Sequence, residues 1–255
     1  MSSPQGAFAE LARSGSRGAL VTVLAGGEPG AKMLVGADRA THGSLGSPRL
    51  EAAAVELAEE LMWSERSERR ELGDVTLFVD VTYPAPRLIA FGAVDMATAL
   101  CRIARATGWR PYVVDPRARF AQPVRFPDAE QVIAAWPEEA FAQLGGIDRA
   151  TSIAVLTHDP KLDDAALILA LRSDAGYIGA MGSRRAQASR RERLLAQGIG
   201  EEELTRIAAP IGLDLGAVTP EETALSILAE VVAVRNGRSG GRLSEAGGRI
   251  HEVGA

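Results

Sequence analysis

The chain contains almost no cysteine and almost no lysine. Cys101 is its single cysteine, which excludes an internal disulfide framework and any zinc or iron–sulfur site built from several cysteines. Lys32 and Lys161 are the only lysines among 28 basic residues, and we interpret this skew toward arginine as compositional. With 33 acidic residues the net charge is −5. That balance predicts no binding surface for nucleic acid or for an anionic membrane.

Long hydrophobic runs are also missing. No apolar stretch approaches the roughly 20 residues that a membrane-spanning helix needs. The opening segment, MSSPQGAFAELARSG, has neither the basic start nor the apolar centre of a secretion signal. The 255 residues are 46% hydrophobic and 24% charged, which is ordinary globular composition for one large or two small domains. We therefore expect a cytoplasmic protein.

The clearest internal boundary is Tyr83-Pro84-Ala85-Pro86, because two prolines in three residues interrupt both helix and strand. Before it, apolar runs at 20–25 and 31–35 flank a glycine-rich turn and predict a hairpin. Helical spacing of apolar residues follows at 50–63, and a further strand is expected at 75–81. These elements predict a small α+β domain over residues 1–83.

After the prolines, strands alternate with helices, which is typical of an α/β fold with a parallel sheet. The expected strands are 88–91, 111–114, 152–156 and 177–180, and the expected helices include 96–107 and 161–171. Thr219-Pro220-Glu221-Glu222 is a capping box that predicts a last helix ending near Asn236-Gly237. We therefore expect a Rossmann-like domain over 84–237 and a flexible, glycine-rich tail over 238–255.

The loop after the first strand of this second domain resembles a dinucleotide-binding fingerprint, G-x-G-x-x-G/A. Gly92 and Ala97 match its first and last positions, but Val94 replaces the middle glycine. Asp115 ends the next strand, about where a ribose-binding acid is expected. If the loop requires a positive φ at Val94, the valine adds strain. The alternative interpretation is a Rossmann-like domain that binds no dinucleotide.

Two further strand ends carry candidate cofactor-binding residues. His158 and Asp159 follow the third strand, where open α/β sheets bind ligands; Asp159 is also a helix N-cap candidate, and His158 could equally be structural. Gly182, Ser183 and Arg184 follow the fourth strand and resemble an anion site that takes a cofactor phosphate. The alternative for Arg184 is a solvated basic helix.

Gly212 and Asp214 lie in a loop, Pro210-Ile211-Gly212-Leu213-Asp214-Leu215-Gly216, that could line a cavity or simply make a tight turn. Cys101 falls inside the first helix of the second domain, and we expect it to be a small buried hydrophobic residue. No catalytic residue and no metal ligand is predicted.

The second domain resembles the XdhC/CoxI family, the accessory proteins of xanthine dehydrogenase and related molybdenum hydroxylases. The matching stretches run in order from residue 91 to residue 237. They are FGAVDMATAL, VVDPRARFA, RFPDAEQV, VLTHDPKLDDAAL, YIGAMGSRR and PIGLDLGAVTPEETALSILAEVVAVRNG. GAKMLV at 30–35 and GSLG at 43–46 resemble the family's N-terminal module.

This resemblance implies a molybdenum-cofactor chaperone without turnover of its own. Its cargo would be molybdopterin or its cytosine dinucleotide form, and NAD(P) is not expected. Its partners would be the large subunit of the hydroxylase and a cysteine desulfurase-type sulfurating enzyme, and formation of a homodimer is left open. The resemblance also implies that the protein supports cofactor sulfuration and insertion.

Two departures from the family pattern affect this expectation. Arg49 stands where the family's N-terminal module has a cysteine, and Val94 stands where its loop has a glycine. An arginine supplies no thiolate for molybdenum or sulfur chemistry. Two alternatives therefore remain: an NAD(P)-dependent oxidoreductase that uses His158 as a proton relay, and an adaptor that contacts the hydroxylase without binding cofactor.

Overall fold

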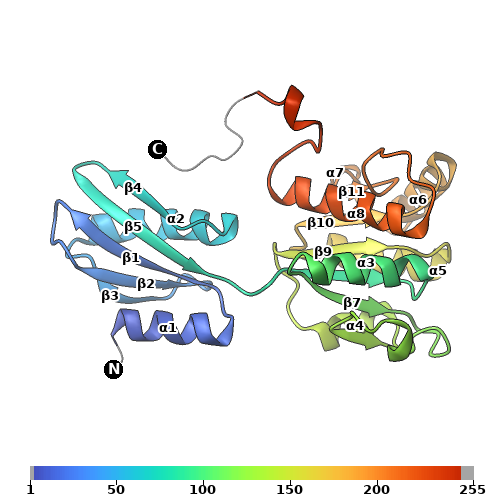
Figure 1. The fold of residues 1–255 in the computed structure, drawn as a ribbon, viewed down its shortest axis with the longest axis horizontal. Helices are drawn as coiled ribbons and strands as arrows, with labels where there is room; N and C mark the ends of the chain where they lie inside the picture. The colour runs from blue at the N-terminus through green and yellow to red at the C-terminus, as the bar shows by residue number, and fades with distance from the viewer. Residues whose placement is uncertain (1–2, 248–255) are drawn as a thin grey trace. The chain divides into compact units, whose positions relative to one another are not determined.

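The computed structural model describes residues 3–247, which form two compact units (Figure 1), one up to Ala85 and one from Pro86 to Ala246. Each unit has its own sheet, and no strand is shared between them. This confirms the α/β fold class expected from the sequence. Among the described residues, no helix has both the length and the apolar character required to cross a bilayer. The predicted domain limits stay predictions, and the last eight residues of the predicted tail lie outside the described residues.

The first unit is a five-stranded antiparallel sheet in the order β3-β2-β1-β5-β4. Its strands are β1 (Gly18–Ala25), β2 (Lys32–Gly36), β3 (Thr41–Ser44), β4 (Glu68–Leu72) and β5 (Val75–Thr82). Its helices are α1 (Pro4–Ser14) and α2 (Pro48–Ser64). The predicted hairpin is confirmed as the β1–β2 pair.

The core of this unit lies between α2 and the sheet. The buried residues of α2 recur at helical spacing: Ala54, Leu57, Ala58, Leu61 and Met62. They join alternate residues of β1, among them Val21, which is fully buried. A three-to-four-residue period on the helix thus meets a two-residue period on the strand, which is how one helix covers one sheet face.

The second unit is a six-stranded parallel sheet in the order β11-β10-β9-β6-β7-β8. Its strands are β6 (Arg87–Phe91), β7 (Arg110–Val114), β8 (Gln131–Ile133), β9 (Thr151–Val155), β10 (Tyr177–Ala180) and β11 (Ile207–Ala208). Its α-helices are α3 (Asp95–Ala106), α4 (Pro137–Leu144), α5 (Pro160–Leu171), α6 (Arg184–Ala196), α7 (Glu201–Leu204) and α8 (Pro220–Arg235). Short 3₁₀ turns cover Pro123–Arg125 and Leu243–Glu245.

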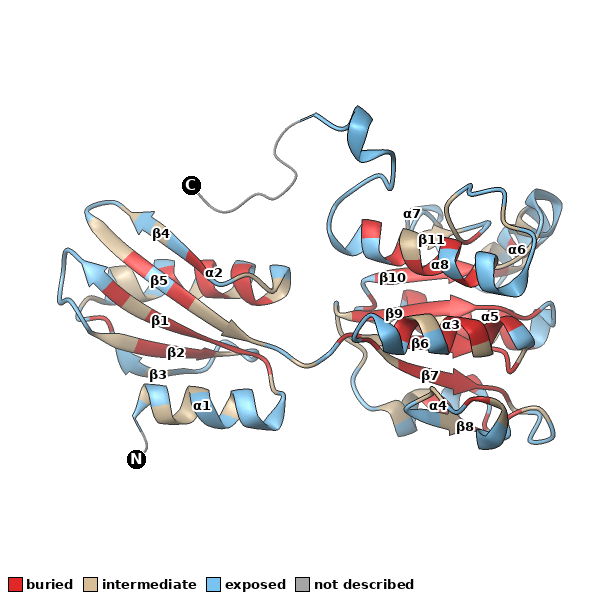
Figure 2. Cartoon of the chain, viewed as in Figure 1, coloured by how far each residue is buried: buried red, intermediate tan, exposed pale blue. Residues whose placement is uncertain are grey.

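Helices cover both faces of this sheet. One cluster of buried residues joins α3 and α8 to one face, and a second joins α4, α5 and α6 to the other. The central strands β6, β7 and β9 are buried along nearly their whole length (Figure 2). Burial on both faces explains why these strands are continuous apolar runs in the sequence.

The capping box of α8 forms as predicted. The Thr219 hydroxyl accepts a hydrogen bond from the Glu222 amide at 3.1 Å, and the Glu222 carboxylate accepts one from the Thr219 amide at 3.1 Å. Two of the four orphan donors at this helix end are thereby satisfied.

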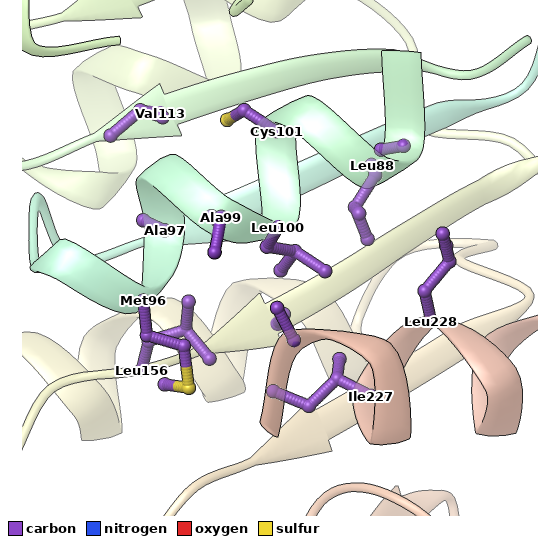
Figure 3. Packing of buried hydrophobic residues seen from close by; sticks show 14 of the residues in the cluster. Leu88, Met96, Ala97, Ala99, Leu100, Cys101, Val113, Leu156, Ile227 and Leu228 are labelled. Carbon is purple, nitrogen blue, oxygen red and sulfur yellow. The ribbon is translucent and has the colours of Figure 1, made fainter. Parts of the chain in front are cut away.

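Cys101 is buried within α3, with 1% of its surface exposed. Figure 3 shows its side chain among the labelled core residues, pointing toward Val113 of β7. Burial raises the pKa of the thiol to about 12, and the nearby Asp128 carboxylate adds to the shift. The expectation of a small buried hydrophobic residue is confirmed.

We expect Cys101→Ala to lower the free energy of unfolding by about 1 kcal/mol, because it removes one buried atom from a packed core. In the native protein the thiol should not react with the reagent DTNB at pH 8, since the thiolate is scarce and shielded. Denaturant titration of both proteins, with labelling in and out of denaturant, checks this. Fast labelling of the native protein would show that Cys101 is an accessible, reactive group.

Candidate functional site

Backbone hydrogen bonds align the segments that follow the parallel strands. In three of these bonds the donor is the first residue after a strand, and in the fourth it lies three residues after one. Each acceptor lies at the end of a neighbouring strand. The four bonds are Gly92 N to Val114 O (2.8 Å), Leu156 N to Phe91 O (2.8 Å), Met181 N to Val155 O (2.8 Å) and Ile211 N to Ala180 O (3.1 Å). The predicted binding residues therefore follow one another along the carboxyl edge of the sheet, the edge at which α/β proteins bind ligands.

Gly92 is required by the geometry of this edge. Its φ is +120°, and a Cβ there would lie 2.4 Å from the Thr157 side-chain methyl carbon. Only glycine fits both the backbone conformation and the space. The close approach holds the loop after β6 against Leu156 and Thr157, which follow β9 and precede His158 in the chain.

The Asp115 carboxylate is fully buried and accepts four hydrogen bonds. Oδ2 accepts from the Ala93 amide at 2.9 Å and from Arg117 Nη2 at 2.7 Å. Oδ1 accepts from the Arg117 amide at 2.9 Å and from Arg117 Nε at 2.8 Å. A carboxylate offers about four lone-pair sites, so none is left for a ribose hydroxyl while Arg117 stays in place.

Two opposing effects set the pKa of Asp115. Burial alone would raise it, but the hydrogen bonds from Arg117 and from the Ala93 amide hold the pKa below its ordinary value. The carboxylate is therefore ionised at neutral pH and anchors Arg117, whose side chain is 40% exposed. The same hydrogen bond raises the pKa of Arg117, and the Asp159 carboxylate contributes to that rise across the edge. Sequence reasoning did not assign Arg117, although the Asp-Pro-Arg spacing at the end of a strand was the available signal.

Val94 is not strained. Its φ is −100° and its ψ 163°, so it is extended backbone at the N-cap of α3. The strain was expected only if Val94 needed a positive φ, and that condition is not met, because the left-handed turn of this loop is made at Gly92. The next residue, Asp95, places a carboxylate in the first turn of α3, where it pairs with Arg125 at 3.1 Å.

The exit of β9 combines one buried network with two exposed candidates. Thr157 hydrogen-bonds to Asp163 of α5, and Asp163 pairs with the buried Arg190 of α6 at 3.0 Å. Burial raises the pKa of Asp163 despite these hydrogen bonds. Asp159 caps α5 by accepting from the Lys161 amide at 3.0 Å, which confirms the N-cap prediction. His158 is exposed beside it.

The exit of β10 is built over Arg190. Gly182 has a φ of +133°, and Arg190 Nη2 donates to the neighbouring Met181 carbonyl at 3.0 Å. Ser183 caps α6 by accepting from the Ala186 amide at 3.2 Å. Arg184 is exposed in the first turn of the helix. The Ser183 hydroxyl, the N-terminus of α6 and the exposed Arg184 are therefore adjacent in this loop.

Gly212 and Asp214 lie at the outer part of the edge, beyond β10. The Gly212 amide donates to Glu230 of α8 at 2.8 Å, and a Cβ on Gly212 would lie 2.5 Å from the Ser226 hydroxyl oxygen. Packing against α8 therefore accounts for this glycine. Asp214 is exposed. Ligand binding by either residue stays a prediction.

Two surface hollows lie outside the predicted site. One of about 570 Å³ is lined by α5 and α6 residues such as Ile168 and Arg193, and one of about 340 Å³ lies near Tyr177 and Arg206. Neither includes a residue predicted to bind cofactor. Within residues 3–247, no group of three or more histidine, cysteine, aspartate or glutamate side chains is arranged to hold a metal ion.

We expect Asp115→Asn to lower the free energy of unfolding at pH 7 by about 1–3 kcal/mol, because an amide oxygen cannot replace both carboxylate oxygens. The folded-state pKa of Asp115 is depressed, so the wild-type advantage is present above about pH 4 and is lost as the pH falls through the folded pKa. Urea denaturation between pH 7 and pH 2 measures this. A difference that stays constant across that range would contradict the assignment.

Family models match both units. The XdhC Rossmann-domain model matches residues 88–231, which is 144 of the 255 residues, and the model of the XdhC and CoxI family matches residues 11–73. The xanthine dehydrogenase structure from Bacillus halodurans covers 96% of this chain and 98% of its own, with a TM-score of 0.55 and 19% identity. That likeness shows the fold alone.

Curated relatives extend the comparison. The chain is 33% identical over 159 residues to a probable xanthine dehydrogenase subunit of Bacillus subtilis, covering 62% of this chain and 46% of the relative. It is 32% identical over 152 residues to the molybdenum cofactor insertion chaperone PaoD of Escherichia coli, covering 60% of this chain and 41% of the relative. The chain thus spans less than half the length of these relatives. With more than half of its residues matched by the XdhC Rossmann-domain model, the chain belongs to the XdhC and CoxI family.

Proposed function

We propose that the chain binds the molybdenum cofactor at the carboxyl edge of its parallel sheet and assists insertion of the cofactor into a xanthine dehydrogenase or CO dehydrogenase-type hydroxylase. Its family membership supports this, as does its similarity to a protein named a molybdenum cofactor insertion chaperone. The single observation that carries the proposal is the row of exposed polar groups along this edge, mounted on a buried scaffold.

The chemistry of the cofactor suits such an edge. Its dithiolene already holds the molybdenum, so a carrier has to recognise a pterin and a phosphate and need not supply metal ligands. Ser183 and Arg184 offer a hydroxyl and a guanidinium for the phosphate. His158 and Asp159 offer exposed polar groups to the pterin. Gly92 has no side chain, so the backbone of the loop after β6 can lie close to the cofactor.

Asp115 was expected to contact the cofactor directly, but we propose an indirect role for it. With its four acceptor positions occupied, it binds cofactor through Arg117, which it orients. Gly182 allows the left-handed turn that precedes the anion site. Gly212 and Asp214 would line the outer end of the edge.

In this proposal a partner enzyme, and not this chain, transfers sulfur to the cofactor. Arg49 is exposed in the first turn of α2, where the family pattern has a cysteine, and Cys101 is buried in α3. Neither position offers an exposed thiolate. We therefore propose that the chain holds the cofactor while a cysteine desulfurase-type enzyme supplies the sulfur, and that it then contacts the large subunit of the hydroxylase.

A transfer assay tests this function. The chain is loaded with purified molybdenum cofactor, separated from the excess, and mixed with cofactor-free hydroxylase. Recovered hydroxylase activity, together with loss of cofactor absorbance from the chain, is the expected result. Activity that recovers only when free cofactor is present would leave the adaptor as the correct description.

We expect Arg184→Ala to weaken cofactor binding by about 1.5–3 kcal/mol, roughly ten- to a hundredfold, because it removes a charge-assisted hydrogen bond. Arg172→Ala is the matched control. Arg172 is also an exposed arginine, but it lies at the C-terminal end of α5, whereas the carboxyl edge of the sheet is at the N-terminal end of that helix. Absorbance titration of both variants with cofactor gives the dissociation constants. Equal affinity of folded Arg184→Ala and wild type would remove Arg184 from the site.

The oxidoreductase alternative makes an opposite prediction for NADH. We expect no saturable binding of NADH to the wild type, because Asp115 has no free acceptor for the ribose and Val94 adds methyl groups to the loop. Val94→Gly alone should not restore binding, since Asp115 stays occupied. Calorimetric titration decides it. Tight binding by the wild type would favour the oxidoreductase with His158 as its proton relay.

A further inference from the structure

Three arginines in the segment after β7 contact Phe120. The Arg117 and Arg119 guanidinium carbons lie 4.7 and 4.5 Å from the centre of the Phe120 ring. Arg125 Nη1 donates to the Phe120 carbonyl at 3.0 Å and to the Ala93 carbonyl at 3.1 Å. We refer to Arg117, Arg119 and Arg125 as the arginine cluster. The anion site predicted at Ser183 and Arg184 does not include it.

Asp115 orients the Arg117 guanidinium but occupies only part of its hydrogen-bond donors. A guanidinium has five N–H donors, and Asp115 accepts from two of them, so three remain. Its side chain is 40% exposed, while that of Asp115 is fully buried. The buried carboxylate therefore fixes the direction of an open guanidinium, and less conformational entropy is lost when a ligand binds.

The flanking carboxylates limit what this cluster can attract by charge alone. Asp95 pairs with Arg125, and Asp159 lies close enough to Arg117 to contribute to its raised pKa. With Asp115, three carboxylates therefore lie near two of the three guanidiniums, those of Arg117 and Arg125. Selectivity must come from directed N–H groups, and these favour a ligand with several free oxygens.

The cluster is also distant from the anion site at Ser183. The strand order places β6 and β9 between β7 and β10, so the two exits are three strand spacings apart, about 14 Å at about 4.8 Å each. One phosphate cannot occupy both positions. The arginine cluster is therefore a separate feature of the edge.

We propose that the arginine cluster is a phosphomonoester subsite. A phosphomonoester has three free oxygens and a charge between about −1.5 and −2, which match the open Arg117 donors better than a diester does. Because Asp115 is saturated, a ribose hydroxyl gains nothing at the same position. Two sources share this chemistry: the terminal phosphate of molybdopterin, and a separate phosphomonoester. The first source rests on the proposed function, and it would move the phosphate contact from Ser183 and Arg184 to the arginine cluster.

Inorganic phosphate is the first probe. Its binding to the full chain is measured from the broadening of its ³¹P NMR line. We expect saturable binding to the wild type and to Arg172→Ala, and at least tenfold weaker binding to Arg117→Ala. Arg119→Ala, which leaves the Asp115 contacts intact, should also weaken binding and provides the test if Arg117→Ala fails to fold. The subsite would be overturned if the wild type bound no phosphate. It would also be overturned if Arg119→Ala, and Arg117→Ala where it folds, bound phosphate as tightly as the wild type.

Competition then separates the two sources. If molybdopterin displaces phosphate and the cytosine dinucleotide form does not, the terminal phosphate of the cofactor is the occupant. If neither form displaces phosphate, a separate phosphomonoester is the occupant, and the subsite stands even if the chain carries no cofactor. Displacement by the dinucleotide form as readily as by molybdopterin would contradict selection of a monoester.

Discussion

The carboxyl edge of the parallel sheet depends on the buried Asp115 carboxylate. This fully buried carboxylate contacts both the loop after β6, through the Ala93 amide, and the segment after β7, through Arg117. The left-handed turn at Gly92 brings the same loop against Thr157, two residues beyond the end of β9. The ionised Asp115 side chain and the absence of a Cβ at Gly92 thereby hold three neighbouring strand ends together, and Asp115 also orients the exposed Arg117.

A second buried carboxylate organises the other half of the edge. Asp163 joins Thr157 to Arg190, and Arg190 supports the Met181 carbonyl under the loop that presents Ser183 and Arg184. The two carboxylates differ in their electrostatics: hydrogen bonds lower the pKa of Asp115, whereas burial raises the pKa of Asp163. Both serve as scaffold. The exposed groups beside them, Arg117 at one half and Ser183 and Arg184 at the other, are the ones left open to solvent.

The elements that the sequence predicts well are those whose own side chains are buried. The central strands are continuous apolar runs, α2 has a clear helical period, and α8 begins at a capping box. Helix α1 was not predicted because none of its residues is buried, and β3 and β4 lie at sheet edges and consist mostly of polar residues. At the site, the strand ends were predictable from the alternation of strand and helix. Three of the four donors on Asp115 belong to Arg117, two residues along the chain, but the fourth was not predictable, because the Ala93 amide comes from a loop 22 residues away.

Hydrogen–deuterium exchange with and without the molybdenum cofactor tests the central claim most directly, because it locates the bound cargo on the chain. If the carboxyl edge binds the cofactor, protection appears in the segments after β6, β7 and β10, around Gly92, Arg117 and Ser183. Helix α2 of the first unit and the hollow between α5 and α6 should exchange as before. Protection confined to α2 or to that hollow, with none at the three strand ends, would contradict the account.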